Sequence, residues 1–373
     1  MKKSLIALAV LAASGAAMAQ SSVTLFGIVD TNVSYLDGVS NAAGTNTDSK
    51  YGIGTSGNAT SRLGFRGVED LGGGLKANFV IEGGFNLDNG DGASGYAGAK
   101  AGEGFQFKRR STVGLSGGFG EVRMGRELTA AYNATARYDV FGSVGIGQSR
   151  LWADGGVLDA SGTPVANQNG TSLVTTNQRI SNALTYVSPD FSGFKVGLNY
   201  GFGETTTGNS DSGYLGAGLM YDNGPLSLGL GLERLNSGLN SDAVSDIDAW
   251  SLGGSYDFGV AKLLAGYRES KVDRATGENK RLGYYVAATA PVGAGTVRVS
   301  YNRYENELAN VKDKADQFAI GYVYSLSKRT SVYGTYAYIK NKDNGSTFKL
   351  SKDVGVKTNG AQQGFQVGVS HAF

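Results

Sequence analysis

The last ten residues of the chain alternate between two kinds of side chain and stop on an aromatic residue. Large, mostly apolar side chains take every second position, and small or polar side chains lie between them, as expected of a β-strand between two different environments. A closed barrel requires its last strand, which pairs with the first and removes the free edge of the sheet. We therefore expect a membrane-spanning β-barrel. The apolar series is Phe365, Val367, Val369, His371 and Phe373, and the other is Gly364, Gln366, Gly368, Ser370 and Ala372.

The N-terminus has the features of a secretory signal. Lys2 and Lys3 supply positive charge, residues 5–11 form a short apolar run, and Ala17-Met18-Ala19 is a small-x-small cleavage site. We expect residues 1–19 to be a signal peptide and residues 20–373 to be the mature barrel. No apolar run reaches the roughly 18 residues of a transmembrane helix, so we do not expect a helical membrane protein. The signal predicts export from a bacterial cytoplasm.

The composition excludes several classes of protein. The sequence has 34 Lys and Arg against 32 Asp and Glu, and loss of Lys2 and Lys3 with the signal would leave 32 of each. This balance lacks the basic footprint of a nucleic-acid-binding protein. With no Cys and a single His, the chain has no means of building a disulfide or a Cys-bound zinc site, and it offers little for a His-based site. We therefore expect neither enzyme activity nor a cofactor.

Strand-like alternation continues along the mature chain, and no convincing amphipathic helix interrupts it. We count sixteen strands, joined alternately by tight turns and by long polar segments near residues 37–60, 86–104 and 129–178. Short turns on one rim and long loops on the other are typical of outer-membrane barrels, and barrels of about 16 to 18 strands leave an aqueous channel. Residues 129–178, without convincing regular structure, are predicted to fold into the lumen and narrow it.

Five segments together resemble the general porins of Gram-negative outer membranes, and the similarity covers essentially the whole mature chain. They are residues 22–27 (SVTLFG), 61–67 (SRLGFRG), 107–111 (FKRRS), 179–182 (RISN) and 371–373 (HAF). The chain looks most similar to the anion-preferring branch. The resemblance implies a sixteen-stranded, homotrimeric barrel in outer-membrane lipid, with its third long loop folded inward. It also implies that the outer-membrane assembly machinery reads the terminal Phe373.

The resemblance further implies a constriction in which arginines face acidic groups. The matching positions are Arg62, Arg109 and Arg179, with Glu82 as the wall acid and Asp139 as the acid of the inward loop. Arginine keeps its charge beside other arginines because its pKa exceeds about 12, and low-dielectric walls focus the field of such a cluster on a passing ion. Strand alternation admits only one of Arg109 and Arg110 to the lumen. The strand phase selects Arg110, whereas the family match selects Arg109, which we favour on the assumption of a local bulge or strand end.

The predicted function is a water-filled channel for passive diffusion of small hydrophilic solutes and ions, with a preference for anions. Two alternatives stay open at this point. The first is a substrate-specific channel for phosphate, sugars or dicarboxylates, which would contain a saturable site. The second is an adhesin or an enzyme on a barrel scaffold. An enzyme requires a nucleophile and a base, and no motif marks such a pair in this sequence.

Overall fold

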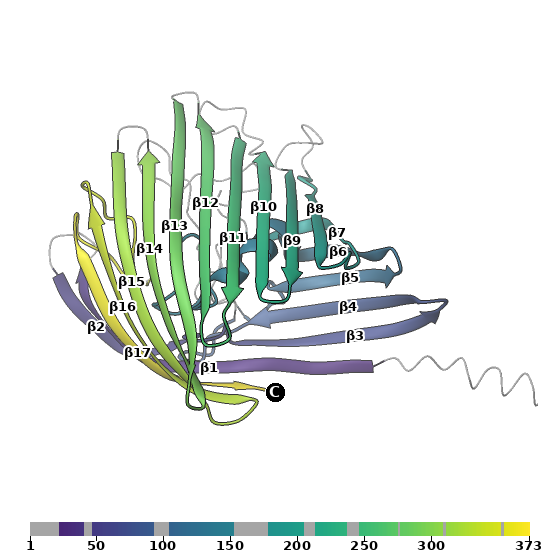
Figure 1. The fold of residues 1–373 in the computed structure, drawn as a ribbon, viewed down its shortest axis with the longest axis horizontal. Coiled ribbons are helices and arrows are strands. Elements are labelled where there is room, and N and C mark those ends of the chain that lie inside the picture. Colours follow the sequence, from purple (N-terminus) through teal and green to yellow (C-terminus); the bar gives the residue numbers. More distant parts are fainter. Residues whose placement is uncertain are drawn as a thin grey trace, which may run out of the picture.

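The computed structural model describes residues 22–40, 47–92, 104–152, 178–204, 213–236, 246–274, 277–308, 311–351 and 354–373. The predicted signal peptide, residues 1–19, lies outside the described residues, as do residues 153–177 of the predicted constriction loop. Within the described ranges, seventeen strands form one antiparallel sheet that closes on itself, which confirms the predicted β-barrel (Figure 1). No helix in this part of the chain is long and apolar enough to cross a membrane.

The strands follow one another around the barrel in chain order. Short turns join successive pairs at one rim, as the sequence predicts (Figure 1). The connections at the other rim vary in length, from residues 275–276 and 309–310 to residues 129–178, so the shorter loops also predicted near Gly277 and Asp313 are wrong. The bounds are β1 (Ser22–Ser40), β2 (Thr47–Thr55), β3 (Arg62–Gly72), β4 (Leu75–Gly84), β5 (Arg110–Gly117), β6 (Gly120–Leu128), β7 (Arg179–Val187), β8 (Phe194–Gly201), β9 (Tyr214–Asn223), β10 (Leu226–Asn236), β11 (Asp246–Asp257), β12 (Lys262–Arg274), β13 (Gly277–Val292), β14 (Gly295–Leu308), β15 (Val311–Ser325), β16 (Thr330–Lys342) and β17 (Ala361–Ala372).

The C-terminal strand closes the barrel by pairing with the first. The ladder between β1 and β17 begins at Ile28 opposite Ala372 and ends at Asp37 opposite Gln363. Beyond it, Gly27 and Phe373 exchange two backbone hydrogen bonds of 3.1 and 3.2 Å. The Phe373 ring lies over Gly27, where any side chain would collide with it. Glycine at this position therefore allows the terminal ring to pack against the first strand.

β2 and β3 together occupy one strand position of the barrel wall, because each pairs with a different part of β1. β2 pairs with β1 from Thr31 to Ser40, and β3 pairs with the other end of β1, from Ser22 to Ile28. The wall therefore has the sixteen positions that the sequence predicts. The prediction of a long loop over residues 37–60 is wrong, because β1 continues to Ser40 and β2 occupies residues 47–55. These polar stretches satisfy their backbone hydrogen-bonding groups by pairing with each other.

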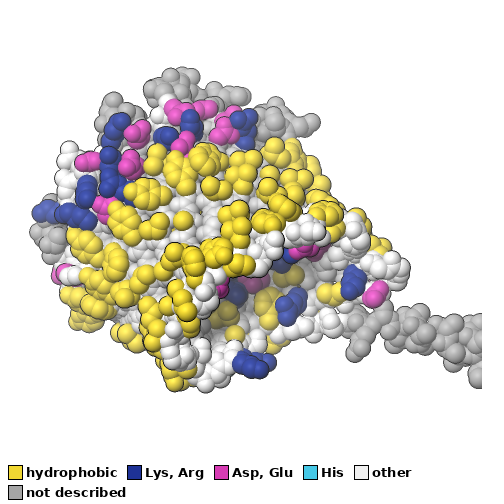
Figure 2. Space-filling view, viewed as in Figure 1, with side chains coloured by type: hydrophobic (Ala, Val, Ile, Leu, Met, Phe, Trp, Pro, Cys, Tyr) yellow, Lys and Arg dark blue, Asp and Glu magenta, His cyan; other side chains and the backbone are white. Residues whose placement is uncertain are grey.

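The outer surface of the barrel is apolar. On β8, the outward residues Phe194, Leu198 and Tyr200 are exposed, as the alternation predicts. Figure 2 shows hydrophobic side chains over much of one outer face, with charged side chains gathered along one rim. An exposed apolar band of this kind is what a barrel presents to lipid.

The connection after β6 folds inward and begins with helical structure that sequence analysis did not predict. α2 (Ala130–Thr135) is followed by the single 3₁₀ turn η1 (Ala136–Tyr138). Thr129 caps α2, because its side chain accepts a hydrogen bond from the backbone N–H of Tyr132 (3.2 Å). Such short helical turns have too few residues to produce a periodic pattern, so the sequence signal is weak.

A bed of glycines on the inner wall receives this helix. A side chain on any of these glycines would meet α2, and at Gly231 a Cβ would lie 2.8 Å from the Ala131 carbonyl oxygen. The absence of side chains lets the helix backbone approach the sheet. Asn199 then accepts a hydrogen bond from the N–H of Ala130. The glycines are Gly197 of β8, Gly218 of β9, and Gly229 and Gly231 of β10.

The rest of the described loop packs against the wall on the far side of the barrel. Its apolar side chains form a buried core with wall residues and with the segment before β17. Arg298 of β14 holds the loop and the wall together, because it donates to the carbonyl of Val140 (3.2 Å) and to the side chain of Asn58 (3.0 Å). The core includes Phe141, Ile146, Leu151 and Trp152 of the loop, and Tyr285, Tyr304 and Phe348 outside it.

Candidate functional site: an arginine-lined constriction

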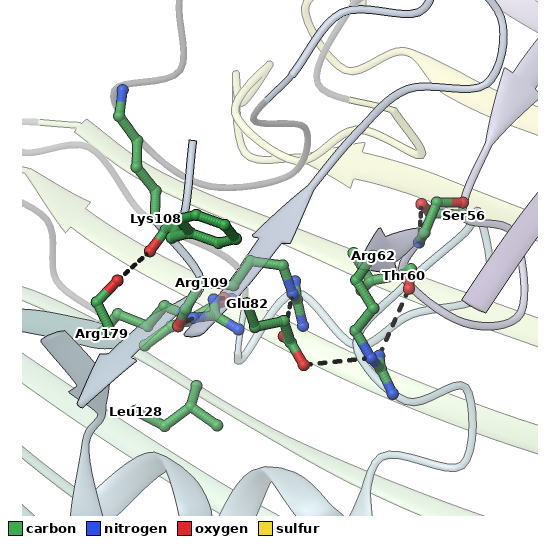
Figure 3. Close-up of polar contacts among 12 residues, drawn as sticks. Ser56, Thr60, Arg62, Glu82, Lys108, Arg109, Leu128 and Arg179 are labelled. Atoms are coloured by element: carbon green, nitrogen blue, oxygen red, sulfur yellow. Dashed lines mark hydrogen bonds and ion pairs between the residues drawn. The ribbon is translucent and has the colours of Figure 1, made fainter. Parts of the chain in front are cut away.

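Two of the predicted arginines share one carboxylate on the inner wall. Arg62 opens β3, and Glu82 lies on β4 opposite Gly64. The Nε of Arg109 lies 2.6 Å from one Glu82 oxygen, and the Nε of Arg62 lies 3.5 Å from the other (Figure 3). Glu82 therefore sits between two guanidinium groups, which fixes their positions and offsets part of their charge.

The third arginine joins this cluster from β7. Arg179 begins that strand, and its Nε donates to the backbone carbonyl of Arg109 at 2.9 Å. The backbone N–H of Arg109 in turn donates to the carbonyl of Glu82 (3.1 Å). The structure thus brings Arg62, Glu82, Arg109 and Arg179 together, and Figure 3 shows them side by side. The group contains three guanidinium groups and one carboxylate.

Both Arg109 and Arg110 lie on the inner side of the barrel. β5 begins at Arg110, so Arg109 precedes the strand and does not follow its alternation. Arg109 binds Glu82, whereas Arg110 binds Glu127 of β6 (Nη2 to Oε2, 2.8 Å). The expectation that only one of the two faces inward is therefore wrong. The end of the strand changes the phase at Arg109.

Asp139 is not part of this cluster. Its carboxylate is buried in the inward loop and accepts hydrogen bonds from the backbone N–H groups of Phe141 (3.0 Å), Ser143 (3.0 Å) and Ser149 (2.9 Å). Burial raises the pKa of this carboxyl, and the three N–H donors act against that rise. The geometry assigns Asp139 to the internal structure of the loop.

Sequence analysis did not identify a second charged group on the same wall. Glu127 is almost completely buried and lies between Arg110 and Arg123, whose Nε is 3.2 Å from Oε2. The register of β6 with β7 shifts between Gly125 and Glu127. Glu127 follows Arg123 by four residues on β6, so strand alternation places both side chains on the same face. This spacing is the signal in the sequence that could have identified the pair.

Comparison with known proteins agrees with this architecture. Residues 5–344 match the Gram-negative porin family. The chain is 47% identical to outer membrane porin protein 32 of Delftia acidovorans, over 100% of both chains. It is 33% identical to an outer membrane porin of Bordetella pertussis, covering 91% of this chain and 95% of that one.

A solved structure supports the same assignment. An anion-selective porin from Comamonas acidovorans superimposes with a TM-score of 0.79 at 44% sequence identity, covering 95% of this chain and 100% of that chain. Sequence and fold therefore agree along nearly the whole length. The chain belongs to the Gram-negative porin family and is an outer-membrane porin, whose barrel forms a water-filled channel for the passive diffusion of small hydrophilic solutes and ions.

Proposed function

We propose that this porin prefers anions and that Arg62, Arg109 and Arg179 provide the preference. The observation that carries the proposal is the balance of charge in the cluster, which contains three guanidinium groups and one carboxylate, Glu82, paired with two of them. The similarity to the anion-selective porin from Comamonas acidovorans supports the same proposal. We further propose that the chain is a passive channel without catalytic activity.

The electrostatics of a narrow, water-filled passage explain how such a cluster selects ions. At an effective dielectric of about 20, a unit charge 4 Å from an anion contributes roughly 4 kcal/mol before desolvation. The constriction lowers the effective dielectric and concentrates the field, while water in the lumen keeps the site weak enough for ions to leave. Anions are therefore concentrated at the cluster and cations are depleted from it.

The inward loop supplies the size limit in this proposal. We assign residues 129–178 to the constriction loop, residues 1–19 to a cleaved signal peptide and residues 20–373 to the barrel domain. The glycine bed and the buried core behind the loop hold its described part against the wall. A loop fixed in this way defines the width of the passage.

We also propose a homotrimer whose subunits meet along β3 to β6. Tyr and Trp mark the interface belts of a lipid-facing barrel surface, and neither residue occurs between Arg62 and Leu128 except for Tyr96 in the β4–β5 connection. The other strands carry many, among them Tyr200, Trp250 and Tyr284 on the outer face. A face without this belt fits contact with other subunits. We assign Phe373 as the signal for the outer-membrane assembly machinery.

Single-channel recording tests the anion preference. The reversal potential is measured in a KCl gradient for the wild type and for the triple variant Arg62→Gln/Arg109→Gln/Arg179→Gln. Wild type is expected to prefer chloride, with a preference that weakens from 0.1 M to 1 M salt as the Debye length falls from about 10 Å to about 3 Å. A conducting triple variant with unchanged chloride preference would refute the assignment of these residues. A wild type without chloride preference would refute the function itself.

A further inference from the structure

Below the constriction, β3 presents a second arginine to the lumen. Arg66 follows Arg62 by four residues on a strand that runs from the constriction to the short turn after Gly72. At about 3.3 Å per residue, the two Cα atoms are about 13 Å apart along the wall. Short turns lie at the periplasmic rim of such barrels. Arg66 therefore lies between the constriction and the periplasmic mouth.

The side chain of Arg66 is exposed and faces the inside of the barrel. Successive residues of a strand alternate between faces, so Arg66 shares the inner face with Arg62. Its guanidinium carbon lies 5.3 Å from the centre of the Phe26 ring. Phe26 shares the inner face of β1 with the buried Asp30. A cation–π contact of this kind holds a guanidinium group in place without neutralising it.

Two acids of β6 are engaged with arginines other than Arg66. Glu127 binds Arg110 and Arg123, and Glu121 binds Arg123 through a contact of 3.3 Å. In the described part of the chain, no carboxylate forms an ion pair with Arg66. The wall below the constriction therefore presents an exposed, unneutralised cation to the water-filled lumen.

We propose that Arg66 is a second anion-binding position on the permeation path. It takes small hydrated inorganic anions or carboxylates that pass between the constriction and the periplasm. The inference rests on the proposed anion preference, and it adds a second anion-binding position at a different point along the passage. Conduction through a selective pore is faster when several weak sites share the passage than when one site holds the ion. A cation about 13 Å from the main cluster, held on an aromatic ring, meets that requirement.

Cysteine chemistry tests the position directly, because the chain contains no Cys. Arg66→Cys is inserted into planar bilayers in 0.1 M KCl, and anionic or cationic methanethiosulfonate reagents are added from the periplasmic side. The cationic reagent is expected to raise the chloride current and the anionic reagent to lower it, each about twofold or more. Failure of the thiol to react, or equal effects of both reagents, would overturn the proposal.

Charge-neutral and charge-conserving variants separate this position from the constriction. Arg66→Gln is expected to reduce chloride current entering from the periplasmic side at 0.1 M KCl more than current entering from outside. The reversal potential should keep the sign of the wild type, and Arg66→Lys should restore the current. If Arg66→Gln carries the same chloride current as the wild type in each direction, the proposed second position is refuted. Loss of selectivity equal to that of the triple constriction variant would make Arg66 part of the main filter and would also refute it.

A matched variant controls for charge at the periplasmic rim. Arg329 lies in the short turn between β15 and β16, away from β3. Arg329→Gln removes one positive charge from the periplasmic rim, and we expect it to leave the direction dependence of the chloride current unchanged. An equal effect of Arg329→Gln would assign the effect to the rim as a whole and refute a local site. If the wild type shows no chloride preference, the proposed function fails independently of these comparisons.

Discussion

The Nε of Arg179 donates a hydrogen bond of 2.9 Å to the backbone carbonyl of Arg109, so one arginine of the constriction holds the backbone of another. Arg109 in turn binds Glu82 through its side chain and through its backbone N–H. The three residues come from β7, from the segment before β5 and from β4. Strands that are far apart in the sequence thus fix like charges close together, with a single carboxylate between two of them.

Removal of that carboxylate should strengthen the anion preference. In Glu82→Gln the cluster loses its negative charge. A unit charge at 6 Å is worth about 0.7 kcal/mol in water and more in a narrow passage of lower dielectric. We therefore expect the chloride-to-potassium permeability ratio at 0.1 M salt to rise at least about threefold. Reversal potentials measure this ratio. Glu69→Gln, which changes an exposed outer-face residue of β3, is the control. A ratio that falls in Glu82→Gln would show that Glu82 acts mainly by positioning the arginines.

The strand pattern of the barrel could be predicted from the sequence because its cause is local. Each strand separates lipid from water, so alternation repeats in every strand, and β17 shows it as clearly as β8. The break between β2 and β3 could not be predicted in this way. Alternation continues through the paired stretches, with Val33, Tyr35, Tyr51 and Ile53 exposed on one face. That β2 pairs with one part of β1 and β3 with the other depends on contacts between strands.

The arginine cluster could be predicted in part for the same physical reason. Arg62 and Glu82 follow the alternation of regular strands, so their faces can be read from the sequence. Glu127 follows Arg123 by four residues, so its face can also be read from alternation. Arg109 lies just outside a strand, so its orientation depends on contacts between strands. Asp139 is turned into its own loop by three backbone N–H groups, and no local pattern records such a contact.

A larger residue in place of Gly253 should displace the inward loop. Gly253 on the inner face of β11 lies against the Tyr138 ring, whereas the neighbouring Gly254 contacts Leu228 on the other face. Gly253→Leu should push η1 from the wall and change the single-channel conductance by a third or more, with increased current noise. Gly254→Leu is the matched control and should conduct like the wild type. Equal conductance in both variants would show that the loop does not depend on this contact.

Asp139→Asn should loosen the same loop. The amide keeps one acceptor oxygen, so at least one of the three buried N–H groups loses its partner, at a cost of about 1 to 3 kcal/mol. Proteolysis of the folded protein within residues 139–152 measures the effect, and the variant should be cut faster. A rate equal to that of wild type would contradict the role of Asp139 in holding the loop.

The pH dependence of the free energy of unfolding provides a second test of Asp139. Burial raises its pKa in the folded protein above the unfolded value. At a pH between the unfolded and the folded pKa of Asp139, the folded state binds more protons than the unfolded state. The contribution of Asp139 to stability therefore grows as the pH falls and is lost as the pH rises through the folded pKa. The difference in stability between wild type and Asp139→Asn should therefore widen on mild acidification. Urea unfolding at several pH values measures it, and a difference that narrows would contradict this linkage.

Loss of the contacts of Asp30 should weaken both the barrel and its selectivity. The buried Asp30 carboxylate accepts the N–H groups of residues 57, 58 and 59 and the hydroxyl of Tyr333 (2.6 Å). Residues 57–59 link β2 to β3, and the carbonyl of Thr60 lies 3.4 Å from Nη1 of Arg62.

Tyr333→Phe removes one hydrogen bond to a charged group, so the free energy of unfolding should fall by about 1.5 to 3 kcal/mol. Asp30→Ala should cost more and should also reduce the chloride preference, because the segment that positions Arg62 loses its anchor. Tyr336→Phe removes an exposed hydroxyl of the same strand and should change neither quantity. Urea unfolding and reversal potentials are measured for each variant. A destabilised Asp30→Ala barrel with unchanged chloride preference would show that Asp30 stabilises the barrel without positioning Arg62.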